Sequence, residues 1–517
     1  MTLPNLNDVR PKFPGTRILA TLGPASESRE AIKALAKAGA SAFRLNFSHG
    51  THEQKRQMVL RVREVAAEIG RPLAILGDLC GPKLRTRECE GGVPLTLVTG
   101  QEIVITASDG KCSGARVTVD YAHLAQDVAR GDRILFDDGL IACEVVRVVG
   151  GDVHARVLNG GPLSSRKGIN LPGVRLSIPP FTERDAADLD FMMEAGVDLV
   201  ALSFVREAAD VVDLKRRVSE HGATIPVIAK IEKPEAVEHI EDILDVADGI
   251  MVARGDLGVE MSPEQVPVVQ KRIIAAARRK SRLVITATQM LDSMTRNPRP
   301  TRAEASDVAN AIFDGTDAVM LSAETASGAF PVESVATMAE IARIAKGSDV
   351  FEAATKKFHL MEGEGILHAT VRAACVAAED VKARAIIPFT ASGWTAFLVA
   401  GQRPRIPVIA CTYNPSAYQR LALCFGVTPV MTERGKDIDD LYVLGMRHLI
   451  EENHVVPGDI VIVVTGSVVR GSGANTIKIH RVGTADLSDD PETRRRLREL
   501  VATMQETAED PARPVGE

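Results

Sequence analysis

The sequence predicts an α/β protein: a TIM (β/α)8 barrel, interrupted by a small all-β lid domain and followed by a C-terminal α/β domain. Three observations lead to this fold class. Eight short apolar segments alternate with helical patterns. The helical period is lost between residues 87 and 164, where turn glycines separate short strands. A second strand–helix rhythm starts near residue 346. An open doubly wound sheet is the alternative for the eight-strand part.

The predicted barrel takes up residues 15–86 and 165–345, after an N-terminal arm of residues 1–14 that lacks periodicity. Polar residues gather where its strands end, and the carboxyl ends of barrel strands are where this fold places its sites. Helices are expected over 29–38, 52–69 and 183–195, and strands over 17–22, 41–47, 72–78, 197–203, 225–232, 249–254, 283–288 and 317–322. One more helix is expected to begin at Pro234, with Val237, Ile240 and Leu244 at helical spacing.

The two other predicted domains differ in pattern. The lid domain, residues 87–164, has strands but no sustained helical period. The C-terminal domain, residues 346–483, alternates again between the two patterns. A charged tail, residues 484–517, carries three consecutive arginines in a short helical pattern and is expected to be a solvated appendage. Strands are expected over 102–106, 116–119 and 133–136 in the lid and over 385–388, 408–411 and 459–464 in the C-terminal domain, whose first helix is expected over 365–380.

The composition excludes several functional classes. The net charge of −6 over 517 residues gives no support for binding nucleic acid or an anionic membrane. The 7 cysteines are scattered without a CxxC motif, which favours a reducing compartment and argues against a zinc site. No apolar run approaches the length of a membrane span, and the N-terminus lacks a secretory pattern. We therefore expect a cytoplasmic enzyme.

The stretch from Ile225 to Glu260 delivers charged residues to two neighbouring strand ends. Period-two alternation puts Lys230 and Glu232 on one face at the end of the first strand, and Asp256 follows the second. Two carboxylates with water and a phosphate suit Mg²⁺. A lysine beside them suits charge that develops on a phosphate or an enolate. The alternative is a Lys–Glu ion pair beside a turn aspartate.

Two other places carry groups that suit phosphate. Arg44, Asn46 and Ser48 alternate onto one face of the second strand. The run 390–395 offers hydroxyls and a glycine at the start of a helix, which is a natural phosphate nest, or simply a helix N-cap. Cys80 lies close to the expected site, and we interpret it as a packing residue rather than a nucleophile.

These motifs together resemble the pyruvate kinase family. The resemblance runs in unbroken order over roughly residues 15–483 and is highly specific. The matching stretches are ATLGPAS at 20–26, RLNFSHG at 44–50, GPKLRT at 81–86, DDGL at 137–140, KGINLPG at 167–173, AKIEKPE at 229–235, MVARGDLGVE at 251–260, ATQML at 287–291 and PTRAEASDVANA at 300–311.

The resemblance implies that the chain transfers the phosphoryl group of phosphoenolpyruvate to ADP, giving pyruvate and ATP in glycolysis. By position it implies Glu232 and Asp256 as Mg²⁺ ligands, with Mn²⁺ as a substitute. Lys230 would stabilise the transferring phosphoryl group and the enolate, and Arg44 would hold the phosphoryl group. Such positioning and charge neutralisation are what phosphoryl transfer requires.

The same resemblance assigns the remaining substrate contacts. The substrate carboxylate would be bound by the backbone amides of Gly255 and Asp256 and by the Thr288 hydroxyl. The lid would close over the site and exclude water, with Asp138 on its nucleotide-facing edge. Thr288 and the Ser322–Glu324 segment are both candidates for protonating the enolate. The positions that match nucleotide-phosphate contacts are Asn46, His49, Arg85 and Lys167.

The sequence departs from the family at the end of the third strand. Many relatives have a carboxylate where this chain has Lys83. A fixed ammonium there supplies positive charge and repels an added cation. We therefore expect activity without K⁺; the alternative is that Lys83 points to solvent and K⁺ binds as usual. The K⁺ site by family position consists of Asn46, Ser48, Asp78 and Leu79.

The C-terminal domain resembles the family's allosteric domain, and the resemblance also implies a homotetramer. Ala391 and Trp394 depart from basic residues that some relatives carry in the effector loop. A sugar monophosphate or AMP is therefore as good a candidate effector as fructose bisphosphate. The positions that match the phosphate-binding loop are Thr390, Ser392, Gly393 and Thr395.

Two competing functions remain at this stage. One is another barrel enzyme that works on a Mg²⁺-bound pyruvate enolate, such as an aldolase or a phosphonomutase. That enzyme needs neither the lid nor the nucleotide-side Arg85 and Lys167. The other is a binding paralogue with a dead site, against which the intact Lys230, Glu232 and Asp256 argue.

Overall fold

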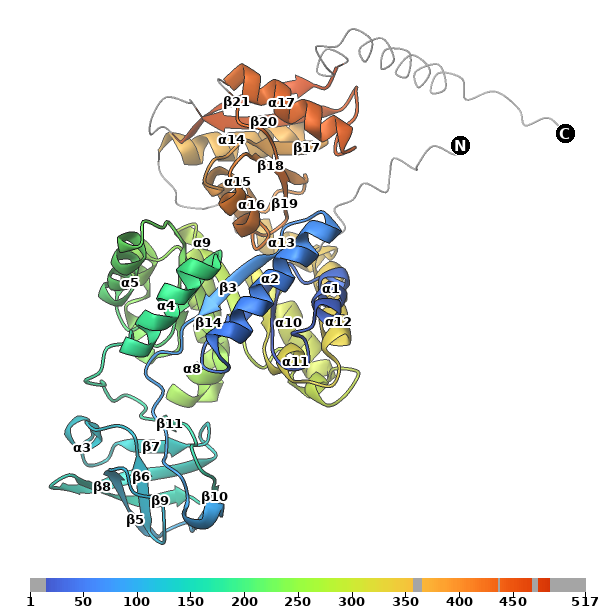
Figure 1. Cartoon of the computed structure of the whole chain (residues 1–517). Coiled ribbons are helices and arrows are strands. Elements are labelled where there is room, and N and C mark those ends of the chain that lie inside the picture. The colour runs from blue at the N-terminus through green and yellow to red at the C-terminus, as the bar shows by residue number, and fades with distance from the viewer. Residues whose placement is uncertain (1–14, 357–364, 436–437, 467–472, 484–517) are drawn as a thin grey trace.

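The computed structural model describes residues 15–356, 365–435, 438–466 and 473–483 (Figure 1). Three bodies follow one another along the long axis of the molecule: the C-terminal domain, the barrel and the lid (Figure 1). The arm 1–14 and the tail 484–517, with its predicted short helix, lie outside the described residues.

The central body is a closed barrel of eight parallel strands, as the sequence predicts, and not an open sheet. Its strand order around the barrel is β1-β16-β15-β14-β13-β12-β3-β2. Each strand is buried along most of its length, which explains why the sequence shows apolar runs rather than alternation. The strands are β1 (Arg17–Thr21), β2 (Ala42–Asn46), β3 (Ala74–Asp78), β12 (Leu199–Leu202), β13 (Val227–Ile231), β14 (Gly249–Ala253), β15 (Leu283–Ala287) and β16 (Ala318–Leu321).

Helices surround this barrel, and threonines cap several of them. Thr51, Thr182 and Thr301 each accept a hydrogen bond from the backbone of the first turn in a capping box. The helices are α1 (Arg29–Ala38), α2 (His52–Ile69), α4 (Glu183–Ala195), α5 (Ala208–Glu220), α6 (Pro234–Glu238), α7 (Ile240–Val246), α8 (Arg254–Glu260), α9 (Val266–Arg279), α10 (Arg302–Asp314), α11 (Ala323–Ala326), α12 (Pro331–Lys346) and α13 (Asp349–Lys356).

One predicted helix is divided in the structure. The apolar spacing after Pro234 predicts a single helix, but α6 ends at Glu238 and α7 begins at Ile240. His239 lies between them with φ −95° and ψ 20°, outside helical geometry. The buried residues Val237 and Leu244 still face the same core, so the period is preserved across the break.

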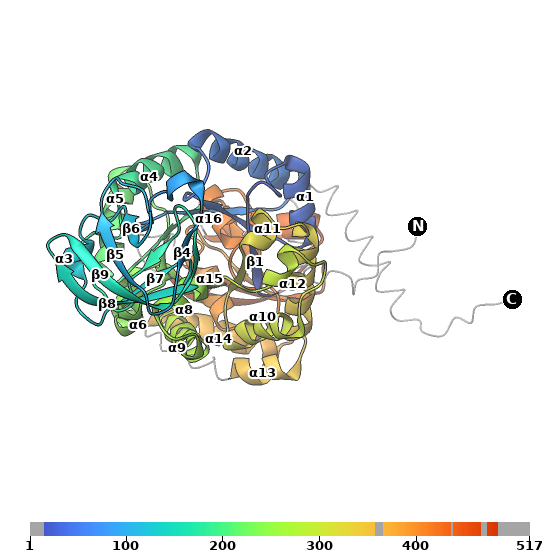
Figure 2. The same ribbon diagram turned by 90° about the horizontal axis from the view of Figure 1, so that it is seen from below.

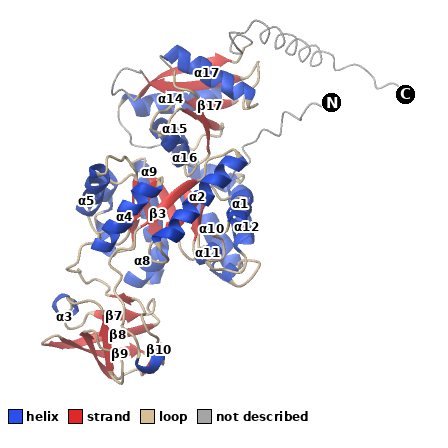
Figure 3. Ribbon diagram, viewed as in Figure 1, coloured by secondary structure: helices blue, strands red, loops and turns tan. Residues whose placement is uncertain are grey.

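The lid consists of two small sheets, and almost all of its regular structure is strand (Figure 3). The larger sheet, here called the lid sheet, has the order β11-β7-β8-β9-β5-β6. β11 lies beyond residue 164 and nevertheless pairs with β7 at the edge of this sheet. The elements are β4 (Leu95–Leu97), β5 (Glu102–Ala107), β6 (Arg116–Val119), α3 (Leu124–Asp127), β7 (Arg133–Phe136), β8 (Ile141–Val149), β9 (Asp152–Asn159), β10 (Gly161–Leu163) and β11 (Ile169–Asn170).

The lid is inserted between β3 and β12, which are neighbours in the barrel. The outgoing and returning segments pair with each other: the Thr86 amide donates to the Lys167 carbonyl at 2.9 Å, and the Ile169 amide donates to the Leu84 carbonyl at 2.9 Å. Seen from the lid side, the lid lies toward α4, α5 and α6 and away from α11 and α12 (Figure 2). The lid therefore stands at the carboxyl ends of the barrel strands, to one side of the mouth.

The C-terminal domain is a five-stranded sheet of order β19-β18-β17-β20-β21, with β21 antiparallel to its neighbour. The sequence predicts β17, β18, β20 and α14, and misses β19 and β21. The elements are α14 (Ile366–Asp380), β17 (Ala385–Pro388), α15 (Trp394–Gly401), β18 (Val408–Thr412), α16 (Pro415–Leu421), β19 (Val427–Met431), α17 (Ile438–Glu451), β20 (Ile460–Gly466) and β21 (Ala474–Arg481).

Two further observations concern the cysteines and the described helices. All seven cysteines are free and buried, including Cys80. Among the described residues, no helix combines the length and the apolar character that crossing a membrane requires.

Candidate active site

Four charged side chains from strands β2, β3 and β13 meet at the mouth of the barrel. The Lys230 ammonium lies 2.8 Å from Glu232 Oε1 and 3.4 Å from Asp78 Oδ1. The Arg44 Nε donates to the other oxygen of Asp78 at 2.6 Å. β2 and β3 pair in register, as do β3 and β12 and then β12 and β13, and this register brings the four groups together. The predicted convergence of Lys230, Glu232 and Arg44 is therefore present, with Asp78 at its centre.

This cluster is deeply buried, and burial and charge act against each other in it. Lys230 is 8 % exposed, and Asp78 and Glu232 are 1 % exposed. Burial alone would lower the pKa of Lys230, but the carboxylates of Asp78 and Glu232 outweigh it and raise that pKa. Burial raises the pKa of Glu232 despite the nearby ammonium. Burial would also raise the pKa of Asp78, but Lys230 and Arg44 hold it below its ordinary value. The site thus keeps Lys230 charged.

The structure adds two residues that the sequence analysis does not single out. The Lys230 ammonium donates to Ser203 Oγ at 2.7 Å, and that hydroxyl donates to the Leu79 carbonyl at 2.7 Å. The Phe204 amide donates to Glu232 Oε2 at 2.8 Å, with Phe204 at a positive φ of 55°. Both residues follow β12, so the strand-end position that identifies Lys230 would also have identified them.

Asp256 and Thr288 form the neighbouring part of the mouth. Asp256 lies in the first turn of α8, directly after β14. The Gly255 amide donates to Thr288 Oγ1 at 2.7 Å, and the Thr288 hydroxyl donates to the Ala287 carbonyl at 2.6 Å. Thr288 has a positive φ of 69°. In this structure the Gly255 amide is therefore engaged by Thr288 rather than presented freely.

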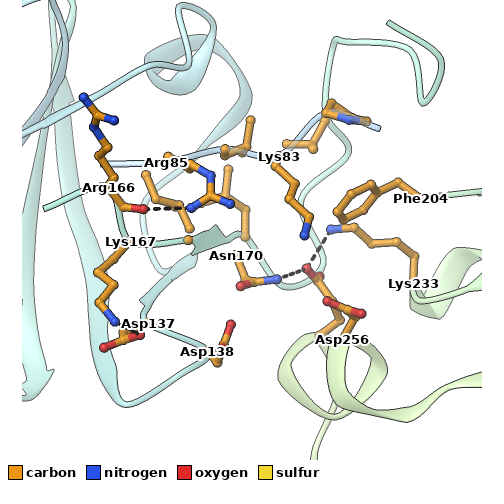
Figure 4. Close-up of a pocket in the computed structure, with 17 residues that line it drawn as sticks. Lys83, Arg85, Asp137, Asp138, Arg166, Lys167, Asn170, Phe204, Lys233 and Asp256 are labelled. Atoms are coloured by element: carbon orange, nitrogen blue, oxygen red, sulfur yellow. Dashed lines mark hydrogen bonds and ion pairs between the residues drawn. The ribbon is translucent and has the colours of Figure 1, made fainter. Parts of the chain in front are cut away.

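A cavity of about 300 Å³ separates the barrel mouth from the lid (Figure 4). Cations and carboxylates alternate on its wall, and Asp256 is its link to the charged cluster. Lys230, Glu232, Arg44, Asn46 and His49 do not line it. Its lining residues are Pro82, Lys83, Leu84, Arg85, Asp137, Asp138, Arg166, Lys167, Gly168, Ile169, Asn170, Leu171, Leu176, Phe204, Lys233, Asp256 and Glu260.

Two of the four nucleotide-side residues predicted from the sequence, Arg85 and Lys167, line this cavity, as does Asp138. The Arg85 guanidinium donates to the Arg166 carbonyl at 2.9 Å. The Lys167 ammonium lies 2.8 Å from Asp137 Oδ1, and Asp138 is beside it (Figure 4). Partial burial, followed by the charges of Lys83 and Arg85, lowers the pKa of His49. His49 thus lies in the positive field of Lys83 and Arg85.

The four residues of the predicted K⁺ site lie together, but their oxygens are largely engaged. Asn46 Oδ1 accepts a hydrogen bond from the Ser48 amide at 3.0 Å. Asp78 contacts Arg44 and Lys230, and the Leu79 carbonyl accepts from Ser203. Lys83 is exposed and extends into the cavity (Figure 4). The contacts of Asp78 are thus made by Arg44 and Lys230, and no contact with Lys83 occurs among the described residues.

The donor set at the mouth fits a magnesium ion. Among the described residues no group of three or more His, Cys, Asp or Glu side chains is placed to hold a metal. The Asp256 carboxylate makes no hydrogen bond or ion pair to any residue in the described ranges, and it lines the cavity. Mg²⁺ takes few protein carboxylates and completes its shell with water and phosphate oxygens. Glu232 and Asp256 could therefore hold the ion with ligands drawn from the cavity.

The second candidate for proton transfer, the Ser322–Glu324 segment, forms the start of α11, with Glu324 buried and Ser322 partly buried. Glu324 is 2 % exposed and accepts hydrogen bonds from the Leu291 and Ser322 amides, at 3.1 and 2.7 Å. Burial raises the pKa of Glu324. Ser322 Oγ is buried and has no hydrogen-bond partner within the described chain. This hydroxyl is therefore free to serve another group.

The predicted effector loop lies at the start of α15 in the C-terminal domain. The Gly393 amide donates to Thr390 Oγ1 at 2.9 Å, and the Trp394 amide donates to Ser392 Oγ at 3.3 Å. Thr390 and Thr395 are buried. The loop supplies no cation of its own, and two of its amides already have side-chain acceptors.

Comparison with known proteins matches this architecture over most of its length. The family profile "Pyruvate kinase, barrel domain" matches residues 13–335, and "Pyruvate kinase, alpha/beta domain" matches residues 368–480. Pyruvate kinases of Sporosarcina psychrophila and Geobacillus stearothermophilus are each 44 % identical to this chain, over 90 % of it and 80 % of their own length. A crystal structure of a pyruvate kinase from Cryptosporidium parvum superposes with a TM-score of 0.85 at 35 % identity, covering 90 % of this chain and 96 % of that one.

Proposed function

The chain belongs to the pyruvate kinase family of phosphotransferases, and from this premise we propose that it transfers the phosphoryl group of phosphoenolpyruvate to ADP with Mg²⁺ and without a requirement for K⁺. The observation that carries the proposal is the buried cluster of Lys230, Arg44, Asp78 and Glu232 at the barrel mouth. This cluster holds two fixed cations where a phosphoryl group and an enolate oxygen would share negative charge.

Each charged residue has a separate role in this proposal. Arg44 holds the phosphoryl group, and Lys230 stabilises the negative charge that develops on the phosphoryl group and the enolate. Asp78 orients both cations through its two oxygens. Thr288, with the amides of Gly255 and Asp256, binds the substrate carboxylate, which requires the Gly255–Thr288 hydrogen bond to rearrange. Positioning of this kind is the main source of acceleration in phosphoryl transfer.

Glu232 and Asp256 are the proposed Mg²⁺ ligands, with Mn²⁺ as a substitute. The bound ion would neutralise charge on the transferring phosphate. The engaged oxygens of Asn46 and Leu79, together with the two cations on Asp78, support activity without K⁺. Lys83 remains the residue to which we assign the difference from K⁺-dependent relatives, through its charge rather than through a contact with Asp78.

The nucleotide is proposed to occupy the 300 Å³ cavity. Arg85 and Lys167 would contact its phosphates, with Asn46 and His49 nearer the barrel mouth and Asp138 on the lid edge. The lid covers one side of the mouth, so its closure would exclude water from the phosphoryl group (Figure 2). The unpartnered Ser322 hydroxyl supports the Ser322–Glu324 segment as proton relay, and Thr288 stays the alternative.

Regulation and assembly are proposed from family membership. A sugar phosphate or AMP would bind at Thr390, Ser392, Gly393 and Thr395, displacing their internal hydrogen bonds. The chain would act as a homotetramer in the cytoplasm, where its seven free cysteines would stay reduced.

The first experiment measures pyruvate formation from phosphoenolpyruvate, ADP and Mg²⁺ in a K⁺-free buffer, and then with K⁺ added. Full activity without K⁺ is the expected result. Activity only with K⁺ would retain the reaction and overturn the K⁺ proposal. Absence of activity in both buffers, with and without sugar phosphates, would overturn the reaction.

The role of Lys83 is tested by reversing its charge. Lys83→Glu is expected to make the enzyme dependent on K⁺, because a carboxylate replaces the fixed ammonium. Lys111→Glu is the matched control, since Lys111 is an exposed lysine of the lid that does not line the cavity. If Lys83→Glu remains indifferent to K⁺, this explanation is wrong.

A further inference from the structure

One buried carboxylate joins the lid sheet to both segments that carry the proposed metal ligands. Glu260 Oε1 lies 2.9 Å from the Lys233 ammonium and accepts a hydrogen bond from Asn170 Nδ2 at 3.0 Å. Figure 4 marks both contacts, from Asn170 and from Lys233, on the cavity wall. Asn170 belongs to β11 of the lid sheet, and Glu260 and Lys233 belong to the barrel. The three residues thus form a bridge across the entrance to the cavity.

The bridge residues of the barrel lie on the same segments as the proposed metal ligands. Glu260 ends α8, the same seven-residue helix that carries Asp256 in its first turn. Lys233 directly follows Glu232 and caps α6. β11 pairs with β7, which leads into Asp137 and Asp138 on the cavity wall. A movement of the lid edge at Asn170 is therefore transmitted to α8 by one hydrogen bond.

The bridge cannot relax into solvent. Glu260 and Lys233 are each 5 % exposed, so neither charge can exchange its partner for water without a large cost. Glu260 Oε2 is buried without a hydrogen-bond partner in the described residues, so both donors share the other oxygen. When the Asn170 side chain is removed, Lys233 is the one remaining side-chain donor to this carboxylate in the described part of the chain. The Asn170 contact should therefore contribute strongly to the position of the lid edge.

We propose that Glu260 is a positioning residue that couples the lid to the metal-ligand segments, holding β11 through Asn170 and the Glu232 segment through Lys233. This inference rests on the proposed roles of Asp256 and Glu232. Both the lid and the barrel form the wall of the nucleotide cavity, whereas the phosphoenolpyruvate-side residues Lys230, Arg44 and Thr288 all lie on the barrel. Loss of the bridge should therefore affect the two substrates differently. Loss of the bridge should weaken nucleotide binding far more than phosphoenolpyruvate binding.

The test uses the full-length enzyme with Asn170→Ala, a neutral change that leaves the Lys233–Glu260 pair intact. The matched control is Asn310→Ala, which removes an Asn–carbonyl hydrogen bond on the exposed face of α10. Amide hydrogen exchange is measured over β7, β11 and β1, and the KM values for ADP and phosphoenolpyruvate are measured separately.

The expected result for Asn170→Ala is exchange about tenfold faster in β7 and β11, with β1 unchanged, since a hydrogen bond to a charged group is lost. The KM for ADP should rise about tenfold, and the KM for phosphoenolpyruvate should stay within about twofold. Unchanged exchange at the lid edge, or an equal rise in both KM values, would overturn the proposal.

Asn170→Asp provides an independent check, because it places a second carboxylate about 3 Å from Glu260. It should loosen the lid edge more than alanine does; a smaller effect than alanine would overturn the role of Glu260. The exchange measurement does not require turnover. If the wild-type enzyme proves inactive with phosphoenolpyruvate and ADP, the proposed function fails while the bridge is still tested.

Discussion

Two strand-to-helix junctions of this molecule carry groups that suit phosphate, and they are built in opposite ways. At the barrel mouth, Lys230, Arg44, Asp78 and Glu232 neutralise one another in a buried cluster. At the start of α15, the loop 390–395 contains hydroxyls and amides but no charged side chain. Two of its amides donate hydrogen bonds to hydroxyls of the same loop. Both lie where a parallel strand ends, so position alone does not distinguish them.

The difference shows what marks a reactive site. A hydroxyl that accepts a hydrogen bond from an amide of its own loop contributes about 1 kcal/mol and is satisfied without any ligand. Buried cations and carboxylates instead cost desolvation, which only close pairing or a bound charged substrate offsets. The barrel mouth therefore holds buried charges whose desolvation cost a bound charged substrate can offset, and the loop at α15 holds none. The predictions below test this contrast, starting with the largest expected effect.

Removing the central cation should have the largest effect. Lys230→Met is expected to lower kcat by about 10²–10³-fold, because the developing negative charge loses a preorganised partner. Steady-state kinetics at saturating phosphoenolpyruvate, ADP and Mg²⁺ measure this loss. Lys215→Met is the control, since Lys215 makes a comparable 2.9 Å ion pair with Asp248 away from the mouth. If Lys230→Met lost no more activity than Lys215→Met, the buried charges of the barrel mouth would not mark it as the reactive junction.

An intermediate effect is expected on the titration of His49 at the edge of the mouth. Partial burial, then Lys83 and Arg85, place its pKa below the ordinary 6.5. The unfolded chain therefore takes up a proton first, so this group's contribution to stability declines as the pH falls through 6.5 toward the folded pKa. ADP should raise the pKa of His49, because its phosphates offset the cations.

Proton NMR of the imidazole in the free and ADP-bound enzyme measures this shift. Lys83→Glu should also raise the pKa of His49 in the absence of nucleotide. If neither ADP nor Lys83→Glu changed the pKa of His49, no positive field would act at this edge of the mouth.

The smallest effect is expected in the loop before α15. Thr390→Val keeps the shape of the side chain but removes the acceptor for the Gly393 amide. The free energy of unfolding should fall by about 1 kcal/mol, the usual net contribution of one intramolecular hydrogen bond. Basal turnover should stay unchanged, because the loop belongs to another domain. Thermal unfolding and steady-state kinetics check both statements; a large loss of basal activity would contradict the view of a self-contained loop.

The barrel and most of the residues at its mouth can be predicted from the sequence, for a physical reason. Parallel strands that are covered on both faces must be apolar throughout, so a polar residue at the end of such a run stands out. This rule identifies Lys230 and Glu232, whereas Asp78 is expected only as a K⁺-site position that the family resemblance implies. The same physics explains the misses: β21 is exposed along much of its length, so it shows no apolar run.

The sequence does not identify the three bridge residues, because their role depends on tertiary contacts. Glu260 ends a short helix and Lys233 begins another, so neither lies at a position where periodicity is informative. Asn170 lies in a two-residue strand, too short for any pattern. Burial of Lys233 and Glu260 beside each other cannot be inferred before the lid sheet has been placed against the barrel. The matching stretches KGINLPG and MVARGDLGVE contain two of these residues but do not say that they touch.

The paired segments at the base of the lid also bear on how the chain folds. β3 and β12 must meet to close the barrel, although the whole lid separates them in sequence. The entropy of closing a loop grows with the length of free chain between its ends. Once the lid has folded, the hydrogen bonds between Thr86 and Lys167 and between Ile169 and Leu84 bring its two ends side by side. Early folding of the lid would thus shorten the effective loop, so a mutation that unfolds the lid should slow the refolding of the barrel.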